Sequence, residues 1–313
     1  MTSTGQRFSV VGTPITHTLS PRMHNAAFEA VRAPYTFDAL DPRTSQGFAQ
    51  WCQDVKHQTG NARGVCGFCT TIPYKQDAFT LCDEVSETAR IIGAVNVVTR
   101  TAGGALLGDN TDAPGFLNAL THELAQQNVE PLSHDSRVVL CGTGGVARAI
   151  IVALIEARVG AIVISSRTLS RAHEFKAEFE AYAHKHGVVL EAVQQSTFSD
   201  VAQSQDAKDE ICSDVHVCVN ATPLGLKATD ELVICPQWMQ DHVKFVFDAV
   251  YSKQGDTKLI AEAKRRAIAC TDGRLMLAEQ GIVAQEIWNQ AYHFWDNEDE
   301  AQRAREALRE ALN

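Results

Sequence analysis

The chain lacks any apolar run near the roughly 18 residues that a membrane-spanning helix needs. Its first residues, Met1–Phe8, lack the long apolar core of a secretory signal, so we expect a cytoplasmic protein. No internal repeat or low-complexity segment is present, and hydrophobic residues make up 45% of the 313 residues. That balance excludes disorder and collagen-like repeats and fits about two ordinary globular domains.

Positive charge is also scarce. The 28 Lys and Arg residues stand against 38 Asp and Glu residues, which gives a formal net charge of −10. A broad nucleic-acid-binding surface carries an excess of basic residues, so this balance argues against one. We expect neither a nucleic-acid nor a membrane partner, although a local basic site for a phosphate is compatible with the composition.

Metal-site and disulfide patterns are missing as well. The 11 histidines form no HExxH or other ligand spacing, and the nine cysteines are an odd number spread along the chain. Cys66-Gly-Phe-Cys69 is a lone CxxC without a second pair at zinc spacing. We interpret it as two reduced thiols on or beside a buried strand, and we expect no metal.

Residues 1–111 alternate strand-like and helical stretches. Strands are predicted at Phe8–Val11, Tyr35–Leu40, Val65–Phe68 and Val95–Thr99. Ser20 is interpreted as the N-cap of a helix with Pro21 at its first position, since apolar residues follow at helical spacing. The alternation predicts an α/β unit.

Residues 112–273 contain the pattern of a βαβ unit. Buried strands are predicted at Arg137–Cys141, Ala161–Ser165, Val215–Asn220 and Phe245–Asp248, with a helix at Val146–Ala157. From Leu275 on the chain is expected to be helical and to finish, over Asp296–Asn313, as a solvated amphipathic helix.

A glycine loop joins the first two of these strands. The residues Gly142, Thr143, Gly144, Gly145 and Val146, followed by Ala147, fit the pattern G-x-G-x-x-G/A between a strand and a helix. The first glycine allows a tight turn, and the second lets the backbone approach a pyrophosphate at the helix N-terminus. The context favours dinucleotide binding over a purely structural turn.

The end of the next strand indicates which dinucleotide binds. An NAD site usually places Asp or Glu there for the ribose 2′-hydroxyl. Here the chain reads Ser165, Ser166, Arg167 and Thr168, with Arg171 one turn later. Two guanidinium groups suit a 2′-phosphate, so the pattern predicts NADP; the alternative is a pair of surface arginines at a helix start.

Polar clusters interrupt the first unit. They are Thr18–Pro21, Thr71–Lys75, Gly93–Asn96 and Gly108–Asp112. Hydroxyls, an amide, a lysine and a carboxylate suit a small polyhydroxylated acid, because each can hydrogen-bond a hydroxyl or a carboxylate. Taken singly, each cluster is equally compatible with a turn or a cap.

In these clusters and the glycine loop the chain resembles the shikimate dehydrogenase family, nearly from end to end. Later matching motifs are Asn220–Gly225, Asp248–Tyr251 and Gly273–Gln280. The resemblance implies NADP-linked interconversion of 3-dehydroshikimate and shikimate, or quinate or aminoshikimate chemistry. It also implies a substrate domain of residues 1–111 completed by helices in 274–313, and a Rossmann-type NADP domain of residues 112–273, with the active site in the interdomain cleft.

The resemblance also implies residue roles. Lys75 and Asp112 would be the catalytic pair, and Thr18 and Ser20 would bind the substrate carboxylate. The remaining substrate contacts would come from Thr71, Asn96, Tyr251 and Gln280. The NADP phosphates and ribose would be held by Gly142–Val146 and Ser166–Arg171, with Ala249 and Gly273 near the nicotinamide.

Three positions depart from the family pattern. Thr18 replaces the usual serine and adds a methyl group, and Ala113 replaces a glycine. Cys69 stands where the family usually has asparagine, which exchanges an amide for a weak donor and acceptor. If the lost partner is a substrate hydroxyl, the cost is ~1–3 kcal/mol, so the reaction class is more strongly indicated than the substrate.

The charged side chain of Lys75 is suited to donate the proton that a developing alkoxide needs, and a nearby Asp112 carboxylate favours its ammonium form. Oxidation, the reverse direction, should therefore improve at alkaline pH. The competing interpretation is a non-catalytic sensor with the same fold, favoured by Cys69 and Thr18 but opposed by intact Asn96 and Gln280. The sequence indicates no particular oligomeric state.

Overall fold

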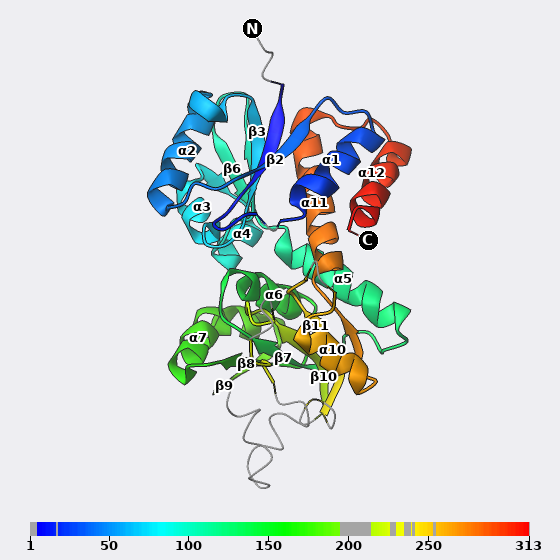
Figure 1. Ribbon diagram of the computed structural model, residues 1–313. Coiled ribbons are helices and arrows are strands. Elements are labelled where there is room, and N and C mark those ends of the chain that lie inside the picture. Colours follow the sequence, from blue (N-terminus) through cyan, green and yellow to red (C-terminus); the bar gives the residue numbers. More distant parts are fainter. Residues whose placement is uncertain are drawn as a thin grey trace. The chain divides into compact units, whose positions relative to one another are not determined.

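The computed structural model describes residues 5–16, 18–194, 214–225, 230–234, 239, 242–252 and 255–312 (Figure 1). The chain forms two compact units: unit 1 comprises Met1–Gly115 and Leu277–Asn313, and unit 2 comprises Phe116–Met276. The divisions fall inside two helices, α5 (Asp112–Gln126) and α11 (Arg274–Tyr292). Among the described residues, no helix is both long and apolar enough to cross a membrane.

Unit 1 contains a mixed six-stranded sheet, here called sheet A. Its strands are β1 (Arg7–Val11), β2 (Thr36–Leu40), β3 (Val65–Thr70), β4 (Glu84–Val85), β5 (Val97–Arg100) and β6 (Leu106–Asp109). Its further helices are α1 (Ser20–Ala30), α2 (Ser45–His57), the 3₁₀ turn η1 (Gly60–Ala62), α3 (Lys75–Leu81), α4 (Glu87–Ile92) and α12 (Glu298–Glu310). The strand order is β2-β1-β3-β5-β6-β4, with β5 antiparallel to both neighbours.

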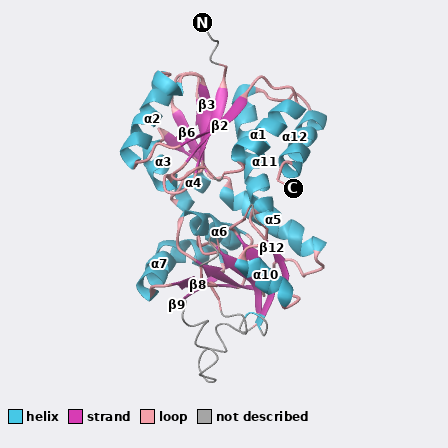
Figure 2. Cartoon of the chain, in the orientation of Figure 1, coloured by secondary structure: helices cyan, strands magenta, loops and turns pink. Residues whose placement is uncertain are grey.

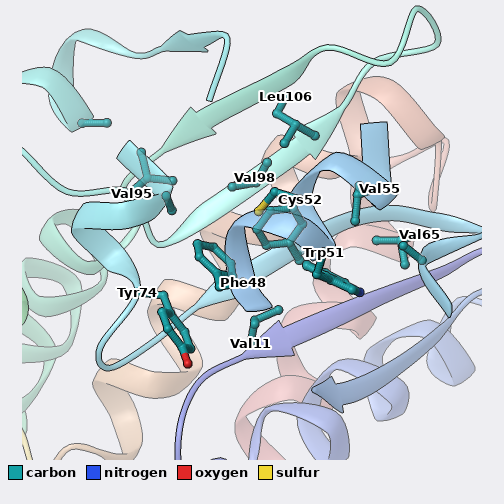
Figure 3. Packing of buried hydrophobic residues seen from close by; sticks show 14 residues of the cluster. Val11, Phe48, Trp51, Cys52, Val55, Val65, Tyr74, Val95, Val98 and Leu106 are labelled. Carbon is teal, nitrogen blue, oxygen red and sulfur yellow. The ribbon is translucent and has the colours of Figure 1, made fainter. Parts of the chain in front are cut away.

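Successive residues of sheet A enter different cores, because side chains alternate across a strand. Val11, Phe68 and Val98 pack with Phe48 and Trp51 of α2 (Figure 3). Their immediate neighbours in the chain, which include Val10 and Cys69, pack with residues of α1 and α11. Helices therefore cover both faces of sheet A, as Figure 2 shows for this unit.

Three sequence-based expectations for unit 1 need correction. Ser20 is not an N-cap: Leu19 holds that position, and Ser20 is the first helical residue. The strand expected from Val95 begins only at Val97, because the Val95 amide donates to the Lys75 carbonyl outside the sheet. The last helix, α12, is solvated on one side only, since its small apolar residues pack against α1.

Unit 2 contains a parallel six-stranded sheet, here called sheet B. Its strands are β7 (Arg137–Cys141), β8 (Ala161–Ser166), β9 (Val189–Gln194), β10 (Val215–Asn220), β11 (Val243–Asp248) and β12 (Ala269–Thr271). Its further helices are α6 (Gly145–Glu156), α7 (Leu169–His186) and α10 (Lys258–Arg265). The four predicted strands are present, whereas β9 and β12 were not predicted.

The order of sheet B is β9-β8-β7-β10-β11-β12, and all its pairings are parallel. Counted along the unit this is the order 3-2-1-4-5-6 of the dinucleotide-binding Rossmann fold. In that fold ligands bind where the strand order reverses, which here lies between β7 and β10. The predicted α/β class with a Rossmann-type unit is confirmed.

Candidate active site

The polar motifs of unit 1 converge at one edge of sheet A. β1 and β3 run parallel and both end at this edge, at Val11 and Thr70. β5 is antiparallel to β3 and therefore begins here, directly after Asn96, while β6 ends here at Asp109. The segments 12–20, 71–75, 93–96 and 110–112 thus leave or enter the sheet at neighbouring positions.

The two residues predicted as the catalytic pair are in direct contact. Lys75 is the first residue of α3, and its ammonium group donates to the carboxylate of Asp112, the first residue of α5. Both side chains are buried, with 10% and 7% of their surfaces exposed. The fold therefore joins an ammonium group and a carboxylate from two separate motifs.

Asn96 links this ion pair to the sheet. Its backbone accepts from the Thr70 amide at 2.8 Å and donates to the Asp109 carbonyl at 3.0 Å. Its side-chain Nδ2 lies 2.8 Å from Asp112 Oδ1, and its Oδ1 accepts from the Thr111 amide at 2.7 Å. The Asn96 amide thereby fixes the carboxylate that orients Lys75.

Gln280 reaches the same cluster from α11. Its Oε1 lies 3.4 Å from both Asn96 Nδ2 and Thr111 Oγ1, while its Nε2 donates to the Leu277 carbonyl at 2.8 Å. Gly115 makes this approach possible, because a Cβ there would lie only 2.6 Å from the Gln280 backbone nitrogen. The structure thus brings together four of the predicted site residues: Lys75, Asn96, Asp112 and Gln280.

Thr111 belongs to the cluster but was missed in the sequence. It is fully buried, and its hydroxyl lies 3.0 Å from Asn96 Nδ2. Its neighbour Asn110 accepts from the Asp112 amide at 3.0 Å. The signal was present, since both residues lie within the selected Gly108–Asp112 motif, in which only Asp112 was assigned a role.

Thr18, Ser20 and Thr71 lie on the segments that follow β1 and β3. The Thr18 hydroxyl donates to Ser20 Oγ at 3.1 Å, and the Thr71 amide donates to the Val11 carbonyl at 2.9 Å. Within the described residues no hydrogen bond joins these three side chains to the Lys75–Asp112 pair. Their hydroxyls therefore take no part in the hydrogen bonds of that pair.

Cys69 is a buried residue of β3, as the interpretation of the CxxC motif predicted for both of its thiols. Burial raises the pKa of the Cys69 thiol to about 12, with the Asp112 carboxylate raising it further and the Lys75 ammonium lowering it. The thiol therefore stays protonated and within electrostatic range of the ion pair. It packs with apolar residues such as Ile15 and Val97.

In unit 2 the glycine loop has the geometry that anion binding requires. Gly142 has φ +113°, and a Cβ there would lie 3.0 Å from the Ala221 carbonyl oxygen, so only glycine fits without strain. A Cβ on Gly144 would meet no atom of the described residues within 4 Å, which leaves its backbone approachable. In the part of the chain that the structure describes, no side chain caps the N-terminus of α6, so its amide groups are available to a phosphate.

The loop after β8 carries the residues that are predicted to bind the 2′-phosphate of NADP. Arg167 and Arg171 are exposed, and neither forms an ion pair with the part of the chain that the structure describes. Thr168 is the N-cap of α7, and its side chain makes no capping hydrogen bond. Ser165 Oγ, at the end of β8, is buried and has no hydrogen-bond partner among the described residues. These free donors suit an anionic ligand.

The ends of β10 and β11 are joined by a buried carboxylate. Asp248 accepts from Asn220 Nδ2 at 2.9 Å, from Thr257 Oγ1 at 2.6 Å and from the Val250 amide at 3.1 Å. Burial raises the pKa of the Asp248 carboxyl to about 6, although these hydrogen bonds oppose the rise. This network holds the start of the segment that carries Ala249 and Tyr251.

Gly273 lies against the same segment. A Cβ at this position would come within 2.4 Å of the Ala249 carbonyl oxygen, so the two backbones touch. The structure therefore brings together Ala249 and Gly273, the two residues expected near the nicotinamide. Among the described residues, no group of three or more His, Cys, Asp and Glu side chains is arranged to hold a metal ion.

Comparisons with known proteins agree with this arrangement. The family model described as shikimate dehydrogenase substrate binding domain matches residues 10–98, and the one described as shikimate / quinate 5-dehydrogenase matches residues 123–212. The shikimate dehydrogenase (NADP(+)) of Rubrobacter xylanophilus is 35% identical over 280 residues, covering 89% of each chain.

Solved structures are similar over almost the whole chain. The shikimate 5-dehydrogenase of Thermus thermophilus, in complex with NADP(H) and shikimate, has 29% identity and a TM-score of 0.74, covering 98% of this chain and 99% of that one. The quinate dehydrogenase of Corynebacterium glutamicum, in complex with NAD, has 26% identity and a TM-score of 0.76, covering 97% and 98%.

The fold and site define a two-domain dehydrogenase of the Rossmann type that uses a nicotinamide dinucleotide. The chain belongs to the shikimate dehydrogenase family, as its motifs predicted.

Proposed function

We propose that this protein is an NADP-dependent shikimate dehydrogenase, which reversibly reduces 3-dehydroshikimate to shikimate on the route to the aromatic amino acids. The observation that carries the proposal is the buried Lys75–Asp112 pair, held by Asn96 and joined by Gln280. Unit 1 is assigned to substrate binding and unit 2 to NADP binding. A cytoplasmic location stays a prediction.

NADP fits the residues of unit 2. The amides of the glycine loop and of the α6 N-terminus would hold the pyrophosphate. The guanidinium groups of Arg167 and Arg171, which form no ion pair with any described residue, would hold the 2′-phosphate. When bound in its reduced form, the cofactor would supply the hydride for reduction, and in its oxidised form it would accept the hydride in the reverse direction. The absence of a carboxylate at the end of β8 argues against NAD, which the related quinate dehydrogenase binds.

Lys75 is assigned the transfer of the proton. In the reducing direction its ammonium group donates to the oxygen of the former ketone, and Asp112 keeps that group charged and directed. Asn96 holds Asp112 in turn, so the carboxylate stays aligned when the substrate enters. Thr18 and Ser20 would bind the substrate carboxylate, while Thr71, Tyr251 and Gln280 would contact the ring hydroxyls.

The second candidate is quinate dehydrogenation, and the observation that favours it is Cys69. A thiol beside the ion pair cannot replace the two donors and the acceptor of the amide that the family usually has there. A substrate with a different hydroxyl pattern would depend less on that amide. The intact Lys75–Asp112 pair opposes the remaining alternative, a sensor without activity.

A substrate panel tests the proposal. The purified protein is incubated with shikimate or quinate and with NADP or NAD, and the absorbance of the reduced nicotinamide is followed over time. We expect the highest kcat/KM for shikimate with NADP. A Lys75→Met variant serves as the inactive control. A protein that binds shikimate but forms no reduced cofactor in any combination contradicts the proposal and supports the sensor.

A further inference from the structure

The two segments that carry the carboxylate-binding and proton-transferring residues are paired beyond the ends of their strands. The Thr71 amide donates to the Val11 carbonyl at 2.9 Å, and the Thr13 amide donates to the Ile72 carbonyl at 3.0 Å. A Cβ on Gly12 would lie 2.4 Å from Thr71 Cγ2 and 3.2 Å from the Ile72 carbonyl oxygen, so the Gly12 backbone lies close against this segment. The parallel pairing of β1 and β3 thus continues into both loops.

A pair of hydroxyl groups closes this contact. Tyr74 Oη lies 2.8 Å from Thr13 Oγ1, which lies 2.6 Å from Asp41 Oδ1. An ionised carboxylate can only accept hydrogen bonds. The Thr13 hydroxyl therefore donates its one hydrogen bond to Asp41 and accepts a hydrogen bond from the Tyr74 hydroxyl. Asp41 also accepts from the Arg43 amide at 2.8 Å. The hydrogen bonds therefore run in one direction, from Tyr74 to Asp41.

Packing fixes the Tyr74 ring, in addition to the hydrogen bond that its hydroxyl makes. The ring is almost fully buried and stacks on Phe48 with centroids 4.7 Å apart and planes inclined by 17°. Figure 3 shows the two rings in the same apolar cluster, with the Tyr74 hydroxyl at the end of its ring. The position of the ring leaves the hydroxyl little freedom to find another partner.

The residues next to this hydroxyl pair belong to the proposed site. Tyr74 is the N-cap of α3 and directly precedes Lys75. Thr13 opens the segment to Thr18, which Ile15 anchors by burying its side chain and accepting from the Thr18 amide at 3.2 Å. A shift between Thr13 and Tyr74 would therefore move the carboxylate-binding hydroxyls relative to Lys75.

We propose that Thr13 and Tyr74 are positioning residues, which set the distance between the hydroxyls of Thr18 and Ser20 and the ammonium group of Lys75. The inference rests on the proposed function, because it assumes a substrate held at its carboxylate and protonated by Lys75. Neither positioning residue is assigned a substrate contact. Small misplacements of a reacting group lower the rate steeply, so one hydroxyl contact can have a measurable effect on catalysis.

Three variants test the pair: Tyr74→Phe, Thr13→Val and the double variant. Each single variant removes the inter-loop hydrogen bond while keeping the shape of the side chain. We expect each to lower kcat/KM for shikimate about tenfold, with the KM for NADP unchanged. The double variant should be no worse than the poorer single one, because both remove the same contact. Thr13→Ser keeps the hydroxyl, so it should have the activity of the unmodified protein, which Thr13→Val lacks.

The matched control is Tyr35→Phe, which loses a hydroxyl hydrogen bond of 3.1 Å to the Tyr292 carbonyl in the same unit. It should match Tyr74→Phe in thermal stability but keep the activity of the unmodified protein. Additive losses, failure of Thr13→Ser to restore activity, or equal losses in Tyr35→Phe would overturn the proposal. An unmodified protein inactive on shikimate with NADP would instead refute the proposed function, and the positioning role with it.

Discussion

The ion pair of Lys75 and Asp112 makes a prediction in which stability and activity respond differently to the same substitutions. Lys75→Met keeps the length of the side chain but leaves the buried Asp112 carboxylate with the amide of Asn96, at 2.8 Å, as its remaining side-chain partner. Asp112→Asn keeps the volume but leaves the buried ammonium group without its counter-charge. Breaking a buried pair on one side costs about 3–5 kcal/mol. We expect each single variant to lose stability in this range.

The double variant, Lys75→Met with Asp112→Asn, should recover most of that loss because no unpaired charge is left. Activity should not recover. Lys75→Met should lower kcat by about 10²–10⁴-fold, the usual contribution of a positioned acid, with a small change in KM. Asp112→Asn should affect both parameters, because it removes the charge that orients Lys75. The double variant should be as inactive as Lys75→Met.

Urea unfolding followed by circular dichroism gives the stabilities, and initial rates at saturating NADP give kcat and the KM for shikimate. The unmodified protein, the two single variants and the double variant are measured at one pH, so that their effects on stability and on activity are comparable. A double variant as unstable as the sum of the single ones would show that the charges are not coupled. A Lys75→Met protein with near-normal kcat and a greatly raised KM would falsify the acid–base role and leave Lys75 as a binding residue.

Three further substitutions test other parts of the structure. Arg167→Ala should largely abolish the preference for NADP over NAD, measured as the ratio of kcat/KM values; equal use of both cofactors by the unmodified protein would contradict the 2′-phosphate assignment. Cys69→Asn should raise kcat/KM for shikimate by restoring amide hydrogen bonds, and an unchanged substrate profile would make Cys69 a packing residue. Asp248→Asn tests the buried carboxyl whose pKa is raised from 3.8 to about 6, so that the folded protein binds the extra proton and its stability falls as the pH rises through this window. The variant should lack this fall in stability, so the difference in unfolding free energy between the two proteins should change between pH 3.8 and about 6. A difference that stays constant over this pH range would refute the prediction.

The sequence predicted those elements whose signals are local. The glycine loop, its flanking strands and the buried thiols of Cys66 and Cys69 follow from short patterns, and the structure contains them. β9 and β12 were missed because β9 is an edge strand with an exposed Val189 and β12 has three residues, so neither shows a buried apolar run. Ser20 was taken as a cap because its side chain suits one, but the structure starts the helix at that residue.

The candidate site shows the same limit. The family motifs indicated Lys75, Asn96, Asp112 and Gln280 one by one, but no local pattern shows that Asn96 meets a glutamine 184 positions later. The Thr13–Tyr74 contact was missed for the same reason, whereas Thr111 lies within a motif that the sequence analysis had selected. Which residues meet at the edge of sheet A is decided by strand order and direction, and these are set by long-range packing.

Unit 1 is assembled from the two ends of the chain, whereas unit 2 is one continuous segment. The indole nitrogen of Trp288 in α11 donates to the Val98 carbonyl at 3.1 Å, and the Trp288 ring packs on Phe8 of β1 with centroids 4.5 Å apart. During synthesis β1 emerges before unit 2, and its packing partner Trp288 emerges after unit 2, so unit 2 can fold while sheet A still lacks one covering layer. The ribosome must therefore pass α11 before Lys75 and Asp112, the proposed proton-transfer residues, have their complete surroundings.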